Sequence, residues 1–545
     1  MLAPVIAGAS ALILVAGAGT SFTADELNYV GRVADLATPA VDYHSLTLEY
    51  VLAPHNGHLQ PAGKLIYEAM FAAFGTDYTA FRVLEVLVVM LCVGLFFELA
   101  RARIGDPAAL LLATLLAFLG AAWEVMIWAF DLHTVGSLAA GLGALLAFER
   151  GGRRADLVAC VLLIASVALV EVGLAFIAGI AVGILIAPDR WRRIWVVAIP
   201  AVLFAAWYAW ALQYDLNGIT SGGLGSLIPS VIDSLGGVLV ALTGTFAPAT
   251  GIATRFVVQD PLATVLAIVV VCLLGFRAFR GGIPRTIWPP LTALLVYWAL
   301  IGLADRPADS SRYVFVGAVL LLLVAGDALR RIKPTTLAIA ALAVLVAIAL
   351  PANIARLFDG GGSLADESAL TRSEFAMLEL AGADADPAYV SAYDPAAHAV
   401  GAPPLVISPS VYAETARRIG SLASSLEQVQ DADVTARRVD DVVLVGALDI
   451  DLEPSPAPQF EGSCRDLPEA PGAVALPPGG ALVSAASSDP AAIGLARFVV
   501  ESPSAQLGSA EPGEWSELRI PSDDRAATLP WRMFYDHPLR ICPLG

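Results

Sequence analysis

Two pairs of side chains that could do chemistry lie in the first long polar segment of the chain, which follows its first hydrophobic stretch. Asp25 and Glu26 are adjacent carboxylates, and His55 and His58 flank an Asn-Gly pair. Near a membrane surface, a carboxylate can accept a proton from an acceptor hydroxyl or share a divalent cation with a phosphate leaving group. Two imidazoles on one side of a turn suit a metal ion or a phosphate. These residues favour chemistry on a lipid-linked substrate at a membrane boundary.

Each of these residues also has a structural alternative, which the sequence leaves open. The acidic pair could cap the amphipathic helix expected at 25–36, because negative charge is favourable near a helix N-terminus. The two histidines could hydrogen-bond backbone carbonyls in a polar loop. Lys64, in the amphipathic segment 62–74, could meet a lipid phosphate or extend to the headgroups.

A second polar segment is short and combines acids with large aromatic rings. It holds Glu124, Asp131 and His133 among Trp123, Trp128 and Phe130. Aromatic rings stack on sugars, and carboxylates bond sugar hydroxyl groups. The segment is therefore a candidate sugar subsite, and the alternative is an aromatic anchor at the membrane interface.

Three further residues stand out because they lie in or beside hydrophobic stretches. Glu171 is the only acid in the apolar run 157–188, and an isolated acid in a membrane segment favours a functional role. Arg312 and Tyr313 precede a late hydrophobic stretch. The planar fork of donors on Arg312 matches a phosphate, and the alternative for this residue is an interfacial anchor.

The elements that must position these residues are predicted to be membrane-spanning helices. The chain of 545 residues is 57% apolar and 15% charged, with a mean hydropathy of +0.72, which is typical of polytopic membrane proteins. The run 156–188 is expected to break near Glu171, because one helix of that length would need extreme tilt. The stretch 226–247 is expected to be interfacial or re-entrant. Eleven spans are predicted, near 3–18, 81–100, 107–122, 134–148, 156–170, 172–188, 194–212, 261–276, 287–303, 313–326 and 335–352.

The charges between these spans predict how the chain crosses the membrane. Arginine clusters, such as Arg101 with Arg103 and Arg330 with Arg331, fall in alternate loops. Basic loops are cytoplasmic, so the loops that carry the acids and histidines are predicted to lie outside. The N-terminus is then cytoplasmic, and an odd number of spans places the end of the chain outside.

Most of the net charge of −18 lies in the last third of the chain. Residues 1–353 hold 20 Lys and Arg against 22 Asp and Glu, whereas residues 354–545 hold 12 against 28. This predicts a multi-span transmembrane domain at 1–353 and an acidic extracytoplasmic soluble domain at 354–545. The latter is expected to be an α/β domain that ends in β-strands, with helices at 367–382 and 411–430 and strands at 495–502 and 515–520. The acidic balance argues against a nucleic-acid partner.

Two of the five cysteines, Cys464 and Cys542, lie in this acidic region. A disulfide between them is plausible if the region is extracytoplasmic.

Residues 1–350 resemble the GT-C superfamily of integral membrane glycosyltransferases, and in particular its actinobacterial members. The superfamily includes protein O-mannosyltransferases, aminoarabinose transferases and arabinosyltransferases. The resemblance lies in the acidic pair, the segment 57–75 (GHLQPAGKLIYEAMFAAFG), Arg82, and Arg312 with Tyr313. It implies that Asp25 is the general base or a metal-linked acid, and that Arg312 contacts the phosphate of a polyprenyl-phosphate sugar donor. His58 and Pro61 stand further apart than the His and Pro of the family.

The sequence thus predicts an inverting glycosyltransferase of a bacterial plasma membrane that moves a sugar from a polyprenyl-phosphate donor to a glycan or protein acceptor of the cell envelope. A divalent cation, Mg²⁺ or Mn²⁺, is a candidate cofactor, with Asp25, Glu26 and His55 as candidate ligands. The alternatives are a noncatalytic scaffold on the same fold and a transporter. The predicted catalytic residues are Asp25 and Glu26, and the predicted substrate-binding residues are His55, His58, Lys64, Glu124, Asp131, His133, Glu171, Arg312 and Tyr313.

Overall fold

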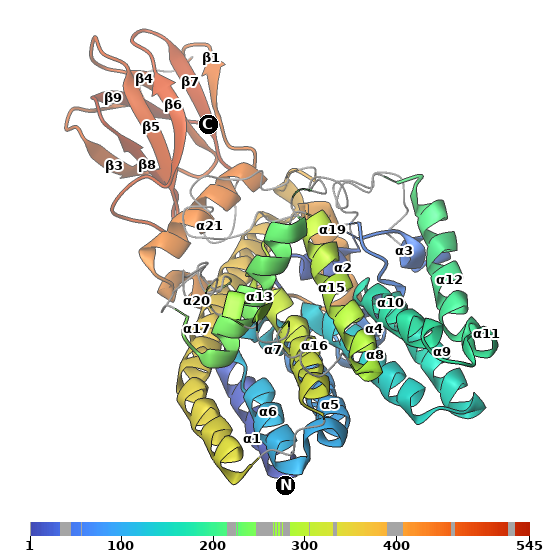
Figure 1. Ribbon diagram of the computed structural model, residues 1–545. Coiled ribbons are helices and arrows are strands. Elements are labelled where there is room, and N and C mark those ends of the chain that lie inside the picture. The colour runs from blue at the N-terminus through green and yellow to red at the C-terminus, as the bar shows by residue number, and fades with distance from the viewer. Residues whose placement is uncertain are drawn as a thin grey trace. The chain divides into compact units, whose positions relative to one another are not determined.

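In the computed structural model, the chain divides into two compact units (Figure 1). The first comprises residues 1–20 and 34–366, and the second comprises residues 21–33 and 367–545. The boundary expected at residue 353 falls inside a continuous helix, α17 (Thr336–Ala381). The structure describes residues 2–32, 45–55, 57–214, 225, 227–246, 255, 265, 267–269, 271–272, 275, 284–304, 306–330, 335–387, 389, 407–458, 464–521 and 529–544.

The first unit is helical. Its longer helices begin and end where the sequence supplies caps: Asp77 accepts a hydrogen bond from the Thr79 amide at the start of α5, and Gly105 follows its last turn. The described elements, besides α17, are α1 (Leu2–Ala16), α3 (Leu48–Leu52), α4 (Pro61–Phe74), α5 (Tyr78–Ile104), α6 (Asp106–Ala117), η1 (Gly120–Ala122), α7 (Trp123–Ile127), η2 (Ala129–Asp131), α8 (Leu132–Arg150), α9 (Arg153–Leu169), α10 (Val172–Leu185), α11 (Arg190–Arg193), α12 (Trp195–Ala211), α13 (Leu227–Thr243), η5 (Arg285–Ile287), α15 (Trp288–Leu303) and α16 (Ser311–Leu329).

Five of the described helices are long and apolar enough to cross a membrane, and a sixth crossing results if α6 and the segment Gly120–Ile127, bent by 43°, are counted as one. Four shorter apolar helices, α1, α10, α12 and α13, accompany them. Helices occupy ten of the eleven segments in which spans were expected, while most of 261–276 lies outside the described residues. The chain is therefore a helical membrane protein, and the count of eleven crossings remains a prediction.

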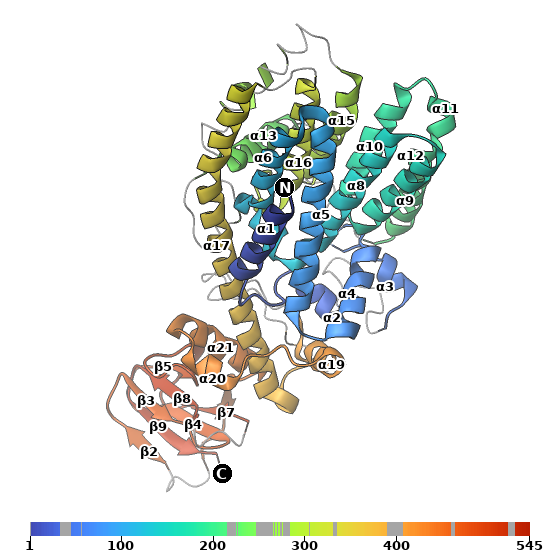
Figure 2. The same cartoon turned by 90° about the horizontal axis from the view of Figure 1, so that it is seen from below.

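Helices α8, α9, α10 and α12 run side by side (Figure 2). The break expected near Glu171 is confirmed, because α9 ends at Leu169 and α10 begins at Val172. Small residues bring α8 close to its neighbours: a Cβ on Gly141 would lie 2.1 Å from the ring of Phe176. Close approach of this kind is the usual way in which helices associate in membranes. The stretch expected to be interfacial forms α13, which packs against α15 and α16.

A buried ion cluster joins the C-terminal ends of α5, α8 and α16. The Arg103 guanidinium is fully buried, donates from Nε to Asp327 at 2.8 Å, and also binds Glu149. Buried charges of opposite sign must be paired, so the three helix ends are held together here. The N-terminal ends of the same three helices lie at the other end of the unit, where the polar residues of interest are found.

The second unit contains a β-sandwich and the helices α2 (Glu26–Gly31), α19 (Pro409–Ile419), α20 (Leu426–Asp431) and α21 (Val434–Ala447), with η6 (Gly382–Asp384) and the last turns of α17. Its two antiparallel sheets have the strand orders β1-β7-β4-β9-β2 and β3-β8-β5-β6. The strands are β1 (Leu452–Ser455), β2 (Arg465–Leu467), β3 (Gly472–Ala475), β4 (Gly480–Ala485), β5 (Ala491–Ala496), β6 (Ala505–Ala510), β7 (Trp515–Arg519), β8 (Arg532–Tyr535) and β9 (Leu539–Pro543).

The sequence-based elements of this region are partly correct. The strand expected at 515–520 is β7, but the one expected at 495–502 overlaps only the end of β5, because the chain leaves the sheet after Ala496. The helix expected at 411–430 is two helices, α19 and α20, separated by residues 420–425.

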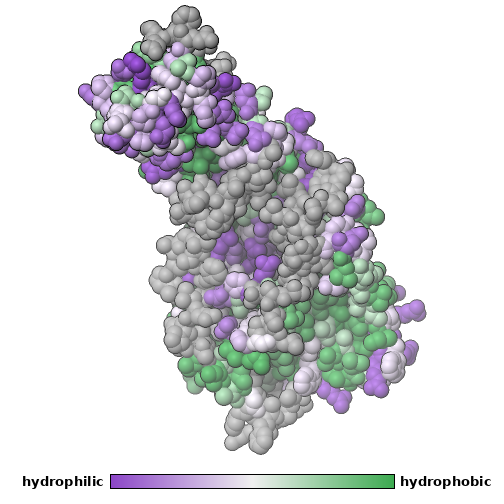
Figure 3. All heavy atoms as spheres, turned by 90° about the horizontal axis from the view of Figure 1, so that it is seen from above, coloured by the Kyte–Doolittle hydropathy of each residue, from purple (hydrophilic) through white to green (hydrophobic). Residues whose placement is uncertain are grey.

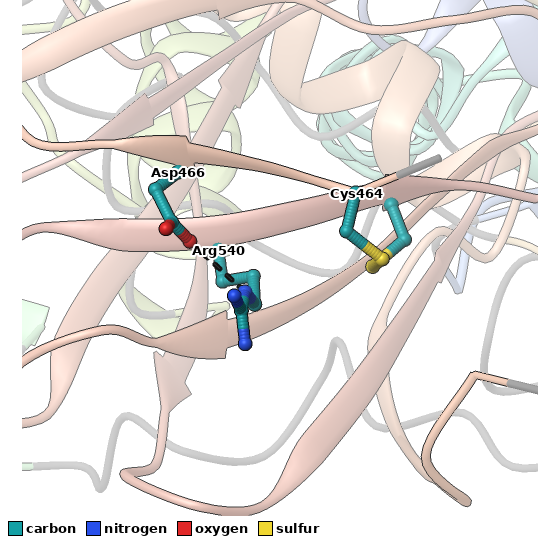
Figure 4. The surroundings of a disulfide bond; sticks show 4 residues. Cys464, Asp466 and Arg540 are labelled. Carbon is teal, nitrogen blue, oxygen red and sulfur yellow. Dashed lines mark hydrogen bonds and ion pairs between the residues drawn. A yellow bond between two sulfur atoms is a disulfide. The ribbon is translucent and has the colours of Figure 1, made fainter. Parts of the chain in front are cut away.

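Cys464 and Cys542 form the disulfide that the sequence suggested, which links the residue before β2 to β9 (Figure 4). Asp466 and Arg540 pair beside it at 2.9 Å.

Candidate active site

The irregular segment between α6 and α8 contributes three side chains to a polar cluster with Arg312. The chain bends through η1, α7 and η2, and this places Glu124, Trp128 and Asp131 before the first turn of α8. The Arg312 guanidinium lies 3.8 Å from Glu124 Oε1 and 3.6 Å from Asp131 Oδ2. It also lies over the Trp128 ring, 4.7 Å from the ring centroid. A cation is thus held between two buried carboxylates and an aromatic face.

The start of α16 presents Arg312 to these groups. Ser311, fully buried, donates its hydroxyl to Glu124 Oε2. Two residues later, the backbone carbonyl of Tyr313 accepts a hydrogen bond from the Tyr297 hydroxyl at 3.3 Å. The first turn of α16 is therefore bound to α7 on one side and to α15 on the other.

A second arginine, Arg255, converges on the same carboxylate. Its guanidinium lies 3.8 Å from Glu124 Oε1 and 6.0 Å from the centroid of the Trp128 ring. Sequence reasoning missed Arg255, since it stands alone in its segment and adjoins no span that was singled out. Glu124 is 2% exposed, so the positive charges of two arginines meet at a buried carboxylate.

His58 and Glu171 form a hydrogen-bonded pair beside this cluster. The Nδ1–H of His58 donates to Glu171 Oε2 at 2.7 Å, and the Leu59 amide donates to Oε1 at 2.8 Å. The break between α9 and α10 makes this possible, because it exposes Glu171 at the end of both helices. Burial favours the neutral imidazole, but the negative charge of Glu171 and its hydrogen bond outweigh burial and raise the pKa of His58.

The turn that carries the two histidines separates their surroundings. His55 and His58 exchange both backbone hydrogen bonds, at 3.0 and 2.8 Å, across a turn in which Gly57 has a φ of 78°. The His55 ring is buried against Phe130, and burial, followed by the positive charge of Lys64, lowers the pKa of His55 to about 3. His55 is therefore neutral near neutral pH.

His133, in the first turn of α8, contacts the other edge of the aromatic group. Its ring centroid lies 4.8 Å from that of Phe130, and it is within electrostatic range of Arg312, His58 and His55. The structure thus places His55, His58, Glu124, Asp131, His133, Glu171, Arg312 and Tyr313 in one region of the first unit, together with Arg255.

Lys64 is buried next to this region. Its ammonium group donates to the carbonyls of Tyr50 and Ala53, at 2.8 and 2.7 Å, and lies over the Tyr50 ring. Burial lowers the pKa of Lys64 to about 7. Lys64 is only 2% exposed, so its side chain closes the end of α3 and does not extend outwards as a headgroup anchor would.

Asp25 and Glu26 belong to the second unit and differ in exposure. Asp25 occupies the N-cap position of α2, where its side chain accepts no capping hydrogen bond, and it is partly exposed. Glu26 is fully buried. Of the two carboxylates, Asp25 is therefore the one that solvent can reach.

Among the residues that the structure describes, no cluster matches the predicted cation site. No group of three or more His, Cys, Asp and Glu side chains there is arranged to hold a metal ion. On the face drawn in Figure 3, hydrophilic residues gather in a hollow.

Comparison with known proteins gives a structural likeness only. No family model and no curated protein matches the chain. It is similar to ArnT from Cupriavidus metallidurans bound to undecaprenyl phosphate, at 13% identity and a TM-score of 0.43, over 70% of this chain and 80% of that chain. The apo structure of the same ArnT is 12% identical with a TM-score of 0.46, over 79% and 90%. Likeness at this level assigns no substrate or reaction, which depend on the site itself.

Proposed function

We propose that this protein is an inverting glycosyltransferase of the GT-C type, which transfers a sugar from a polyprenyl-phosphate donor to a cell-envelope acceptor, either a glycan or a protein. One observation carries the proposal: Arg312 and Arg255 approach the same buried carboxylate beside the face of Trp128. Arginine matches the geometry of a phosphate, and an aromatic face with neighbouring carboxylates suits a sugar ring.

In this proposal the arginines bind the donor phosphate. Their separations from Glu124, 3.8 Å each, exceed ordinary hydrogen-bond distances. A phosphate between them would form charge-assisted hydrogen bonds and meet the negative charge that develops on the leaving group. Glu124 and Asp131 would then accept hydrogen bonds from sugar hydroxyl groups, and His58 would supply a further donor to the phosphate.

The reaction balances with Asp25 as the base. The acceptor hydroxyl oxygen attacks the anomeric carbon, and the bond from that carbon to the phosphate oxygen breaks. The polyprenyl phosphate leaves with the bonding electron pair, and the acceptor proton passes to the Asp25 carboxylate. Attack opposite the leaving group inverts the anomeric configuration. Asp25 is proposed as the base because it follows the first hydrophobic stretch and is partly exposed, whereas Glu26 is buried and is the less suitable base.

A divalent cation stays a separate proposal. Asp25, Glu26 and His55 were its candidate ligands, and no step above passes through it. Assays with EDTA, and with added Mg²⁺ or Mn²⁺, would test it directly: loss of transfer with EDTA that either cation restores would support a role.

The site is proposed to open outside the plasma membrane, with basic loops in the cytoplasm and the acidic region extracytoplasmic. In this proposal the Arg103 cluster, at the other ends of α5, α8 and α16, lies towards the arginine-rich loops that are expected in the cytoplasm. A transporter would instead be expected to carry polar groups near the middle of its spans.

The deciding experiment measures binding and transfer separately. Farnesyl phosphate serves as a soluble probe of the phosphate site on detergent-purified protein. We expect Arg312→Gln to weaken its binding about 10- to 100-fold, because hydrogen bonds to charged groups contribute about 1.5–3 kcal/mol. Arg330→Gln is the matched control, since Arg330 lies at the opposite end of α16 and is 40% exposed. Equal binding by both variants would refute the phosphate site.

Enzyme and scaffold are separated by Asp25→Asn. In a deletion strain, an enzyme with Asp25 as its base would fail to restore the envelope glycan with this variant, although the protein is made and binds farnesyl phosphate. Full restoration of the glycan would refute the catalytic role of Asp25 and favour a noncatalytic scaffold.

A further inference from the structure

The segment that carries Asp25 is fastened to the end of α17 by a set of buried polar contacts. Ser368 is fully buried, and its hydroxyl accepts a hydrogen bond from the Ser21 amide at 3.0 Å and donates one to the Ser21 carbonyl at 3.1 Å. One side chain thus satisfies both backbone groups of Ser21. Buried polar contacts of this kind fix a position, because leaving either group without a partner is costly.

Thr23 makes a second set of contacts with α17, to Glu367 and Thr371. Its hydroxyl lies 3.0 Å from that of Thr371 and 3.3 Å from Glu367 Oε1. Thr371 lies on the same face of α17 as Glu367 and Ser368, because it follows them by four and three positions. Thr23 is fully buried and Thr371 is 2% exposed.

The other side of Asp25 is held by α19. Arg418 donates a hydrogen bond to the Val30 carbonyl, near the end of α2. Gly31 lies against α19 so closely that a Cβ there would be 3.2 Å from Val411. The acidic pair is therefore held on both sides by residues of the second unit.

The backbone at the acidic pair is strained. Ala24 has a φ of 52°, a left-handed conformation that residues other than glycine rarely adopt. Such a conformation persists only where the surroundings enforce it, and it is frequent at functional sites. In this turn Glu26 is fully buried, and Asp25 remains partly exposed.

From these contacts we infer that Ser368 and Thr371 are positioning residues for Asp25, so that the last turns of α17 hold the segment that carries the base. This inference rests on the proposed function. It means that these turns of α17 hold the base in the conformation in which its carboxylate is partly exposed.

The test uses the double variant Ser368→Ala/Thr371→Val in the full-length protein. We expect kcat for sugar transfer to fall at least tenfold, while the affinity for farnesyl phosphate stays unchanged, because the arginines belong to the other unit. The single variant Thr371→Ser, which keeps the hydroxyl group and leaves Ser368 intact, should retain most of the kcat. Ser373→Ala is the matched control, because Ser373 also lies in α17. This variant removes a buried hydrogen bond to Asp440 of α21, and Ser373 makes no contact with Ser21 or Thr23 that the structure describes.

A double-cysteine variant, Thr23→Cys/Thr371→Cys, keeps the inference testable if the double variant does not fold. Oxidation should join the two residues, and the linked protein should remain active, because the active state is the one in which they touch. Loss of activity on oxidation that returns on reduction would overturn the inference.

The outcomes also separate this inference from the proposed function. If Asp25→Asn is inactive but Ser368→Ala/Thr371→Val keeps its full kcat, the positioning role is wrong and the base remains Asp25. If Asp25→Asn is fully active, the assignment of the base fails, and the inference fails with it.

Discussion

Glu171 accepts a hydrogen bond from Nδ1 of His58 at 2.7 Å, although the two residues are 113 positions apart in the chain. An ionised carboxylate can only accept, so Nδ1 must carry a proton. The pairing lowers the pKa of Glu171, because the positive His58 and three hydrogen bonds outweigh the effect of burial. The His58 side chain is 36% exposed, so the ring is partly accessible. When His58 is protonated, the ring is a cationic donor within electrostatic range of Arg312.

The first prediction concerns the pH dependence of phosphate binding. Because the pKa of His58 is raised, its positive charge is fully present below its ordinary value of about 6.5 and is lost as the pH rises through the raised value. We expect the affinity for farnesyl phosphate to fall over that upper range. Glu171→Gln should shift the fall to lower pH, and His58→Gln should remove it. An unshifted profile in Glu171→Gln would contradict the assignment.

The second prediction concerns Arg255. It shares Glu124 with Arg312 but lies further from the Trp128 ring, at 6.0 Å against 4.7 Å. We expect Arg255→Gln to weaken farnesyl phosphate binding less than Arg312→Gln, by about 3- to 10-fold, and the two effects should not add, because residues that share a partner are coupled. Isothermal titration of both single variants and the double variant checks this; strict additivity would show that the two arginines act independently.

The third prediction concerns the buried ion cluster at the other end of the helices. Asp327→Asn should destabilise the protein by about 3–5 kcal/mol, because it leaves the buried Arg103 with one fewer negative partner. Thermal unfolding in detergent measures the loss. Arg330→Gln, which removes only a half-exposed neighbour at 3.7 Å from Asp327, should change the midpoint little. A similar midpoint for both variants would mean that the cluster contributes nothing to stability.

The fourth prediction concerns the disulfide of the sandwich. Cys464 and Cys542 are separated by 78 residues, and closing a loop of that size stabilises a domain by about 2–5 kcal/mol. Cys542→Ser should therefore lower the unfolding midpoint of the second unit. The fluorescence of Trp531, which is buried in this unit, reports on that transition. If dithiothreitol lowers the midpoint of Cys542→Ser as much as that of the unaltered protein, the effect does not come from this bond.

The sequence predicted the polar site better than it predicted the surroundings of each residue. Glu171 and Arg312 could be found because isolated charges are costly in apolar stretches and so mark contacts. Arg255 gave no such signal, and its role depends on distant Glu124. For Lys64 both alternatives assumed a phosphate or lipid contact, whereas its ammonium group is bound by two backbone carbonyls. Burial of that kind is a property of the packed fold.

The grouping of the chain into units was also only partly visible in the sequence. The change from apolar to acidic composition near residue 353 is real, but α17 continues through it to Ala381. The association of residues 21–33 with the C-terminal unit could not be foreseen, because Ser21 and Ser368 meet across 347 positions. Local pattern carries no information about such contacts.

The Arg103 cluster has a consequence for the accuracy of the opposite end of the molecule. Helix α16 has 19 residues and is therefore a stiff rod about 28 Å long. Arg103 fixes the C-terminal end of α16, so a tilt of about 2° at that end would move Arg312 by about 1 Å. A displacement of that size can reduce a reaction rate about 100-fold. Fine alignment of Arg312 is thus secured by ion pairs at the far end of the bundle.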